Sequence, residues 1–255
     1  MRRVVFNQKG GVGKSSITCN LAAISAASGR PTLVIDLDPQ GNTTHYLSGQ
    51  PAQALEGSMF DFFEQSLTLG GGRKSIADLV HATPYENLYV LAAHPELESL
   101  EAKLESRYKI YKLKEALEGL ADIYPEIWID TPPALNFFSR SALIAAESCL
   151  IPFDCDAFSR QALYSLQEAI DELRADHNEA LQVEGIVVNQ FNAQAKLPRQ
   201  LIEELIAEGH PVLPVHLTSS VKMRESHQVS QPLNHYAPKH KLTQQFKSLF
   251  ELLHD

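Results

Sequence analysis

The stretch with the most distinctive chemistry is QKGGVGKSS, residues 8–16. Glycines ahead of a helix let backbone N–H groups surround phosphate oxygens, while a lysine supplies positive charge and a hydroxyl ligates Mg²⁺. The general pattern G-x-x-x-x-G-K-[ST] has a glycine where this chain has Gln8. Because Gln8 retains its N–H, the loop can still bind phosphate if that position needs no positive φ. The residues that we expect to hold phosphate are Gly10, Gly11, Val12, Gly13, Lys14, Ser15 and Ser16, with Lys14 as the cation and Ser15 as the metal ligand.

Three aspartates lie at the ends of two apolar segments, TLVID and EIWID. An aspartate that ends a strand beside a phosphate loop can hold a metal-bound water, which suits Asp130. Asp36 ends the other segment, and Asp38 follows it in DLDPQGN. We expect one of these two carboxylates to face the terminal phosphate and the other to brace the loop. A loop with ordinary caps is the alternative explanation of this D-x-D pattern.

An asparagine marks the end of the apolar segment EGIVVNQF, residues 184–191. The amide of Asn189 could recognise the exocyclic amine of adenine, although a turn-forming asparagine explains the sequence nearly as well. The N-K-x-D pattern typical of GTP-binding proteins is absent, since residues 189–192 are Asn-Gln-Phe-Asn. The sequence therefore favours ATP as the nucleotide.

Apolar segments alternate with helical ones along the chain. Residues 3–7, 32–36, 87–93, 126–130, 148–153 and 184–191 predict strands, and their continuous apolar runs are typical of parallel strands buried on both faces. Residues 14–28 predict a helix that ends at Gly29, so the first forty residues form a βαβ unit. We expect an α/β fold of the P-loop NTPase type, with a mostly parallel sheet, helices on both faces and a single domain over residues 1–255. Residues 67–75 predict a surface loop.

The net charge of -9 argues against a wholly basic nucleic-acid binder, but the charge is unevenly distributed. Residues 209–250 contain five basic residues and a single acidic one, Glu225, a net charge of +4. This segment is the candidate surface for a polyanion, and scattered solvated lysines are the alternative explanation.

No apolar run reaches the ~20 residues of a membrane-spanning helix. The C-terminal segment KLTQQFKSLFELLHD predicts a helix with one apolar face. Its polar face mixes Lys247 with acidic residues, which favours packing onto the domain over binding to a lipid surface. The residues of the apolar face are Leu242, Phe246, Leu249, Phe250 and Leu253.

Lys9 is a second lysine, placed just before the glycines, and it has no evident role inside its own loop. With this residue, KGGVGKSS resembles the deviant Walker A motif of the ParA/MinD family of ATPases, and NQKGG is typical of the ParA-type (Soj-like) members. DLDPQGNTT resembles the family's switch segment, WIDTPPAL its Walker B strand and VVNQFN its adenine-recognising strand end. The resemblance covers essentially the whole chain, with residues 50–125 the least characteristic.

The resemblance implies a Mg²⁺-dependent ATPase that forms a homodimer with ATP sandwiched at the interface. In the family, the early lysine, here Lys9, reaches the partner's nucleotide and acts in catalysis with Lys14. Asp38 would orient the attacking water, while Ser15, Asp36 and Asp130 would form or support the metal site. The ParA-type resemblance also implies non-specific DNA binding and a ParB-like or cargo-adaptor protein that stimulates hydrolysis. The candidate DNA contacts are Lys222 and Arg224, with Lys239 and Lys241 as secondary contributors.

The function expected is thus partition or positioning of a plasmid, a chromosome or a protein assembly, in the cytoplasm and on the nucleoid. A MinD-like ATPase that cycles on a membrane is the first alternative, and NQKGG counts against it. An electron carrier with a bridging iron–sulfur cluster is the second. It would need two exposed cysteines per subunit, whereas Cys19 lies in the loop helix and Cys149 in a buried-looking strand.

Overall fold

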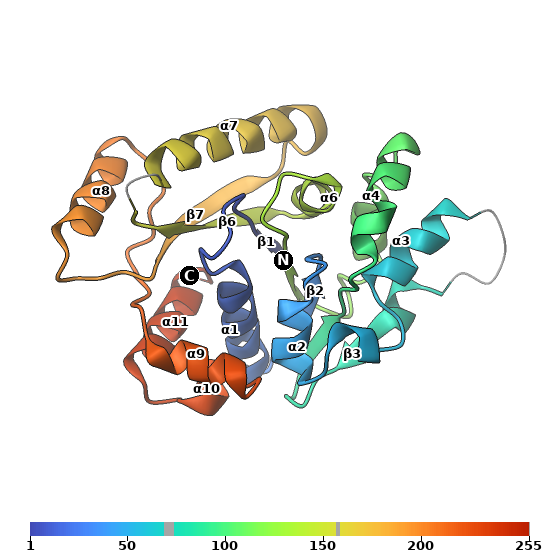
Figure 1. Cartoon of the computed structure of the whole chain (residues 1–255), viewed down its shortest axis with the longest axis horizontal. Coiled ribbons are helices and arrows are strands. Elements are labelled where there is room, and N and C mark those ends of the chain that lie inside the picture. The colour runs from blue at the N-terminus through green and yellow to red at the C-terminus, as the bar shows by residue number, and fades with distance from the viewer. Residues whose placement is uncertain (69–73, 157–158, 255) are drawn as a thin grey trace.

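A seven-stranded sheet forms the centre of the molecule, in the order β3-β4-β2-β5-β1-β6-β7. The computed structural model describes residues 1–68, 74–156 and 159–254 (Figure 1). All strand pairs are parallel except β3–β4, so the prediction of an α/β fold with a mostly parallel sheet is confirmed. The strands are β1 Arg2–Val5, β2 Thr32–Asp36, β3 Val80–Ala82, β4 Leu88–Leu91, β5 Glu126–Asp130, β6 Ser148–Asp154 and β7 Gln182–Asn189. The sequence did not predict β3, because three residues are too few to show a period of two.

Helices cover both faces of the sheet (Figure 1). The α-helices are α1 Lys14–Ala27, α2 Asn42–Ser48, α3 Met59–Leu67, α4 Leu97–Ser106, α5 Lys112–Glu118, α6 Phe137–Ala145, α7 Ser159–His177, α8 Lys196–Ala207, α9 Val221–Gln228, α10 Leu233–Tyr236 and α11 Lys241–Leu252. The described residues also include two short 3₁₀ helices, η1 Ala52–Ala54 and η2 Ile76–Leu79. Helix α3 ends at Leu67, and most of the loop predicted for residues 67–75 lies outside the described residues.

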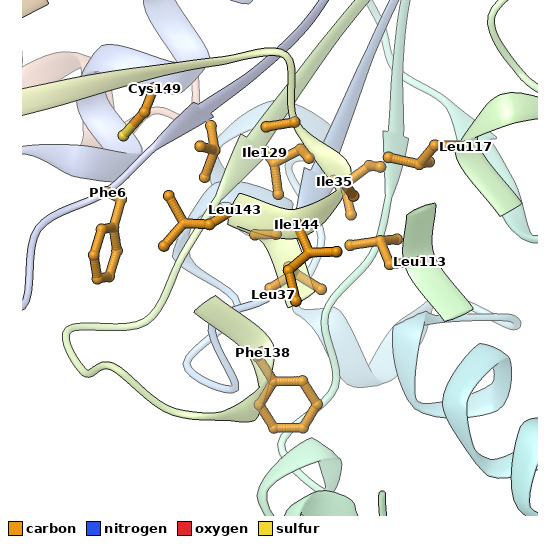
Figure 2. Packing of buried hydrophobic residues seen from close by; sticks show 14 of the residues in the cluster. Phe6, Ile35, Leu37, Leu113, Leu117, Ile129, Phe138, Leu143, Ile144 and Cys149 are labelled. Atoms are coloured by element: carbon orange, nitrogen blue, oxygen red, sulfur yellow. The ribbon is translucent and has the colours of Figure 1, made fainter. Parts of the chain in front are cut away.

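Alternate side chains of the central strands are buried in two separate cores, one on each face of the sheet. On β2, Ile35 belongs to the core under helices α3 to α8, whereas Val34 belongs to the core under α1, α2, α10 and α11. The same alternation separates Ile129 from Trp128 on β5. Figure 2 shows Ile35, Ile129 and the α6 residues Leu143 and Ile144 meeting in the first core. Both faces are therefore buried, which is why the strands are apolar along their whole length.

The C-terminal helix α11 packs its predicted apolar face onto the domain. Leu242, Phe246, Leu249 and Phe250 are buried in the same core as α1, and Leu253 packs against this core. Among the described residues, no helix is long and apolar enough to cross a membrane.

The carboxyl ends of β1, β2 and β5 meet at one edge of the sheet, because these strands are neighbours and parallel. Residue pairs in register there include Val5 with Asp130 and Asp36 with Asp130. The chain runs from β1 to β2 on one side, while β6 lies on the other side of β1. In open parallel sheets, ligands bind in the crevice at such a change of direction.

Candidate functional site

The glycine loop between β1 and α1 depends on two left-handed positions, Gly11 with φ of 79° and Gly13 with φ of 95°. The described non-glycine residues with positive φ do not include Gln8. The condition under which the loop tolerates glutamine at position 8 is therefore met. A Cβ atom at Gly13 would lie 2.2 Å from Nδ2 of Asn189, so this position requires glycine for space as well as for conformation.

The end of β7 holds the loop from the other side. Nδ2 of Asn189 donates a hydrogen bond of 2.8 Å to the Val12 carbonyl oxygen, and Nε2 of Gln190 donates one of 2.9 Å to the Gly11 carbonyl oxygen. Asn189 therefore fixes the shape of the loop as well as lining the space beside it. Sequence reasoning suggested only an adenine contact or a turn for this residue.

Lys14 is the first residue of α1, and its side chain is turned into the loop. Only 7% of the residue is exposed, and Nζ donates a hydrogen bond of 2.9 Å to the Lys9 carbonyl oxygen. Burial lowers the pKa of Lys14, and the charges of Asp130 and Asp38 oppose this shift. A buried ammonium between a loop carbonyl and two carboxylates is a site that an anionic ligand would stabilise.

Asp36 braces the segment that follows β2. Its Oδ2 accepts hydrogen bonds of 2.8 Å from the backbone N–H and from the hydroxyl of Thr44, and its Oδ1 accepts one of 3.1 Å from the N–H of Asp38. Residues two apart in a strand would share one face, but β2 ends at Asp36 and the chain turns before Asp38. The two carboxylates consequently take different positions.

Asp130 is fully buried and only half satisfied. Its Oδ2 accepts a hydrogen bond of 2.7 Å from the Thr43 hydroxyl, whereas Oδ1 has no partner at hydrogen-bond distance, although the nearby Ser15 hydroxyl lowers the pKa of this carboxyl. Burial raises the pKa of both Asp130 and Asp36, and for Asp36 the neighbouring charge of Asp130 adds to the shift. An unpartnered buried carboxylate oxygen next to a second carboxylate fits a cation or its water ligand.

Two adjoining cavities lie over this edge of the sheet. The larger, of about 660 Å³, is lined by Lys14, Ser15 and Asp38, and the smaller, of about 340 Å³, by Asn189 and Arg224. Gly11, Gly13 and Ser16 line both cavities, so the glycine loop and the start of α1 form part of the wall of each. Asp38 is 8% exposed, and burial raises its pKa, while the Gln40 N–H and Lys14 oppose the shift.

Several residues around these cavities were not identified from the sequence. Those lining the larger cavity are Gln40, Asn42, His45, Tyr46, Pro133, His227 and Gln228, and those lining the smaller one include Thr218, Ser219, Ser220, Met223 and Leu242. Most come from the region after β7, about 200 residues away from the loop in sequence. No local pattern marks those of α9, because tertiary packing alone brings this helix to the start of α1.

Comparison with known proteins assigns the family. A family profile described as an AAA domain matches residues 3–183. The "Chromosome partitioning protein ParA" of Myxococcus xanthus is 32% identical over 96% of this chain and 84% of its own length. The chain belongs to the ParA/MinD-type P-loop ATPases.

Solved structures at lower identity share the fold of this ParA/MinD-type chain. Cobyrinic acid a,c-diamide synthase from Mycobacterium smegmatis, with bound ATP analog and magnesium, has a TM-score of 0.86 at 23% identity, covering 99% of this chain and 94% of the other. The McdA(D38A)–ATP complex from Cyanothece has a TM-score of 0.84 at 21% identity, covering 100% of this chain and 96% of the other. At such identities the likeness establishes the fold only.

Lys9 of this ParA/MinD-type chain is directed away from its own loop. Its Nζ donates a hydrogen bond of 2.7 Å to Oδ2 of Asp154, the last residue of β6, and another to Asp156, two residues further on. Burial lowers the pKa of Lys9, but the contacts with the two carboxylates outweigh it and the net shift is upward. Among the described residues that line the two cavities, Lys9 is absent.

The four residues predicted to contact DNA do not share one environment. Lys222 pairs with Glu225 at 2.7 Å and lies over the ring of Tyr236, while Arg224 lines the smaller cavity. Lys239 and Lys241 are exposed at the start of α11 and make no ion pair within residues 1–68, 74–156 and 159–254. The exposed charges of Lys239 and Lys241 are thus available to a polyanion, whereas that of Lys222 is already compensated by Glu225.

Proposed function

We propose that this chain is a partition or positioning ATPase that hydrolyses ATP with Mg²⁺ and cycles between an ATP-bound dimer and a monomer. The observation that carries the proposal is the convergence of Lys14, Ser15 and Asp38 on one cavity, beside the unpartnered Oδ1 of buried Asp130. The similarity to the chromosome partitioning protein ParA of Myxococcus xanthus supports the assignment to the cargo-positioning class.

The roles that we propose follow from the contacts. Backbone N–H groups of residues 10–16 would bind the phosphates, with Lys14 as the cation. Ser15 and Asp130 would hold Mg²⁺, which when bound neutralises phosphate charge. The described residues contain no group of three or more His, Cys, Asp or Glu that could hold a metal. This fits an ion shared between one or two protein oxygens and substrate phosphates. Asp36, whose oxygens accept bonds from the protein itself, would support the site indirectly.

Asp38 is the candidate for orienting the attacking water, because it lines the cavity while Asp36 does not. Asn189 lines the smaller cavity, which we assign to the adenine. Lys9 would act on the nucleotide of a partner subunit, because its side chain lies outside the lining of its own cavities. Exchange of Asp154 and Asp156 for phosphate would then accompany dimer formation.

The dimer would bind DNA without sequence preference through the basic residues of residues 209–250. Two copies of the segment double the phosphate contacts, and each contact adds to the free energy of binding. A ParB-like or cargo-adaptor protein would stimulate hydrolysis and release the DNA. With DNA as its matrix, the protein would act in the cytoplasm and on the nucleoid. The apolar face of α11 is buried against α1 and the rest of its core, so this face would not bind a lipid surface in the described conformation.

The experiment is light scattering after size exclusion, with Mg²⁺ and either ADP or ATP. Asp38→Ala should remain dimeric in ATP and monomeric in ADP, and the matched charge-removing variant Lys9→Ala should remain monomeric in both. Gel retardation with two duplexes of unrelated sequence should require ATP and weaken sharply with salt. ATP-dependent sedimentation with anionic liposomes, without DNA retardation, would favour a membrane-cycling protein instead.

A further inference from the structure

Helix α9 lines the larger cavity with His227 and Gln228, and His227 also contacts the phosphate loop helix. Nε2 of His227 lies 3.0 Å from Oγ of Ser16, and the His227 ring stacks on Tyr46 of α2 with 4.2 Å between ring centroids. Ser16 is in the first turn of α1, and all three residues line the cavity. One imidazole therefore joins α1, α2 and α9 beside the space that we assign to the phosphates.

Neighbouring contacts attach the rest of the inner face of α9 to the same two helices. The hydroxyl of Ser226, which is fully buried, lies 2.9 Å from the Tyr46 hydroxyl. On the preceding turn, Sδ of Met223 lies 3.8 Å from Nδ2 of Asn20 on α1. These contacts, from Met223 to His227, join both turns of α9 to α1 and α2.

In the hydrogen bond between Ser16 and His227, either side chain can be the donor. Burial lowers the pKa of His227, so its neutral imidazole has one N–H donor and one acceptor nitrogen. Phosphate oxygens only accept hydrogen bonds. If the Ser16 hydroxyl donates to a phosphate, its oxygen is left to accept from His227, which requires the proton on Nε2. Without a phosphate, the hydroxyl is free to donate to Nε2 instead.

We propose that His227 is a positioning residue that turns the Ser16 hydroxyl toward bound nucleotide and transmits nucleotide occupancy to α9. This inference rests on the proposed function, since it requires a nucleotide in the cavity. Its consequence is that α9, which carries Lys222 and Arg224, becomes more rigid when the nucleotide binds. The basic surface and the phosphate loop are then linked inside one subunit, independently of dimer formation.

Two substitutions separate the hydrogen bond from the packing. His227→Phe keeps a ring that can stack on Tyr46 but loses the donor, whereas His227→Gln keeps a donor near the position of Nε2 but loses the ring. His235→Phe is the matched control, because His235 also stacks on a tyrosine, Tyr85, but lies outside the lining of both cavities in the described residues. Binding of Mg²⁺–ADP by calorimetry avoids any dependence on hydrolysis.

We expect His227→Phe to weaken ADP binding by roughly three- to tenfold, the usual effect of one hydrogen bond. His227→Gln should stay within about twofold of wild type, since the donor is retained. Hydrogen exchange supplies the second readout. ADP should slow exchange of the α9 amides in wild type and in His235→Phe, but not in His227→Phe, while the first turn of α1 is protected in all three.

The outcomes distinguish the inference from the function on which it rests. Equal ADP affinity of wild type and His227→Phe, or equal protection of α9 in both, would overturn the role of His227 and leave the ATPase proposal intact. A wild-type protein that binds neither ADP nor ATP would overturn both. If His227→Phe is poorly folded, a loss of affinity in His227→Gln matching that expected for Phe would equally contradict the hydrogen-bond argument.

Discussion

Gly13→Ala tests whether the contact between Asn189 and the glycine loop stabilises the loop. Gly13 has φ of 95°, and a Cβ atom there would lie 2.2 Å from Nδ2 of Asn189. That amide donates its hydrogen bond to the Val12 carbonyl oxygen and cannot move without breaking this bond. Gly29 is the matched control, because its φ is 84° and a Cβ atom there would meet nothing within 4 Å.

The two glycines allow the strain to be separated from the collision. A left-handed conformation costs a non-glycine residue about 1–2 kcal/mol, and both variants carry this cost. Gly13→Ala additionally displaces Asn189 and leaves the Val12 carbonyl without its partner, which costs about 1–3 kcal/mol more. The free energy of unfolding should therefore fall by roughly 1–2 kcal/mol in Gly29→Ala and by about 2–5 kcal/mol in Gly13→Ala.

Urea unfolding followed by circular dichroism measures both values, and a double-mutant cycle identifies the cause. In an Asn189→Ala background the colliding amide is gone, so Gly13→Ala should cost no more than Gly29→Ala costs in wild type. Equal destabilisation by Gly13→Ala and Gly29→Ala in the wild-type background would refute a collision with Asn189. An unchanged cost of Gly13→Ala in the Asn189→Ala background would refute it as well.

Three further predictions follow from the charges of the site. Lys14→Ala should lower ADP affinity by about a hundredfold, because phosphate loses a charge-assisted donor, and unchanged affinity in calorimetry would contradict the loop assignment. Lys9→Ala should still bind ADP and ATP but lose ATP-dependent dimerisation and turnover, so wild-type turnover in a phosphate-release assay would remove the case for its action on a partner. Burial raises the pKa of Asp36 to about 8 and also raises that of Asp130, so the folded chain retains protons that the unfolded chain releases near pH 4. The nucleotide-free protein should therefore become less stable as the pH rises from about 4 to about 8, and its stability should fall more steeply than that of the Asp130→Asn variant. Urea unfolding that shows a flat or rising stability over this range would disprove the prediction.

The parts of the fold that follow from local physics were predictable from the sequence. The buried parallel strands show as continuous apolar runs, and the first βαβ unit, the glycine loop and the end of α1 at Gly29 were identified within one or two residues. The edge strand β3 was missed because it is short and antiparallel. The apolar face of α11 was predicted to pack on the domain, and burial of Leu242 and Phe246 confirms it.

The location of the site could be predicted from the sequence more fully than the residues that form it. Spacing in the sequence identified Lys14, Ser15 and the aspartates, since a loop motif and strand ends fix their positions. It suggested His227 only as one of several histidines that could add charge near a polyanion, because nothing in a polar helix shows that the fold brings this histidine to Ser16. The pairing of Lys9 with Asp154 and Asp156 was equally hidden, since strand order alone places the end of β6 beside the loop after β1.

The position of α9 also determines which charge reversals can isolate DNA binding. Lys222→Glu would place its new carboxylate beside Glu225, and Arg224→Glu would place one in the lining of the smaller cavity. Loss of DNA binding in such a variant could therefore reflect a weakened nucleotide site. Lys239 and Lys241 line neither cavity in the described part of the chain and are exposed. The Lys239→Glu, Lys241→Glu double variant should therefore keep the ADP affinity of wild type and still lose DNA retardation at moderate salt. Unchanged retardation would contradict a role for these two lysines and would point to the basic residues of α9 as the DNA contacts.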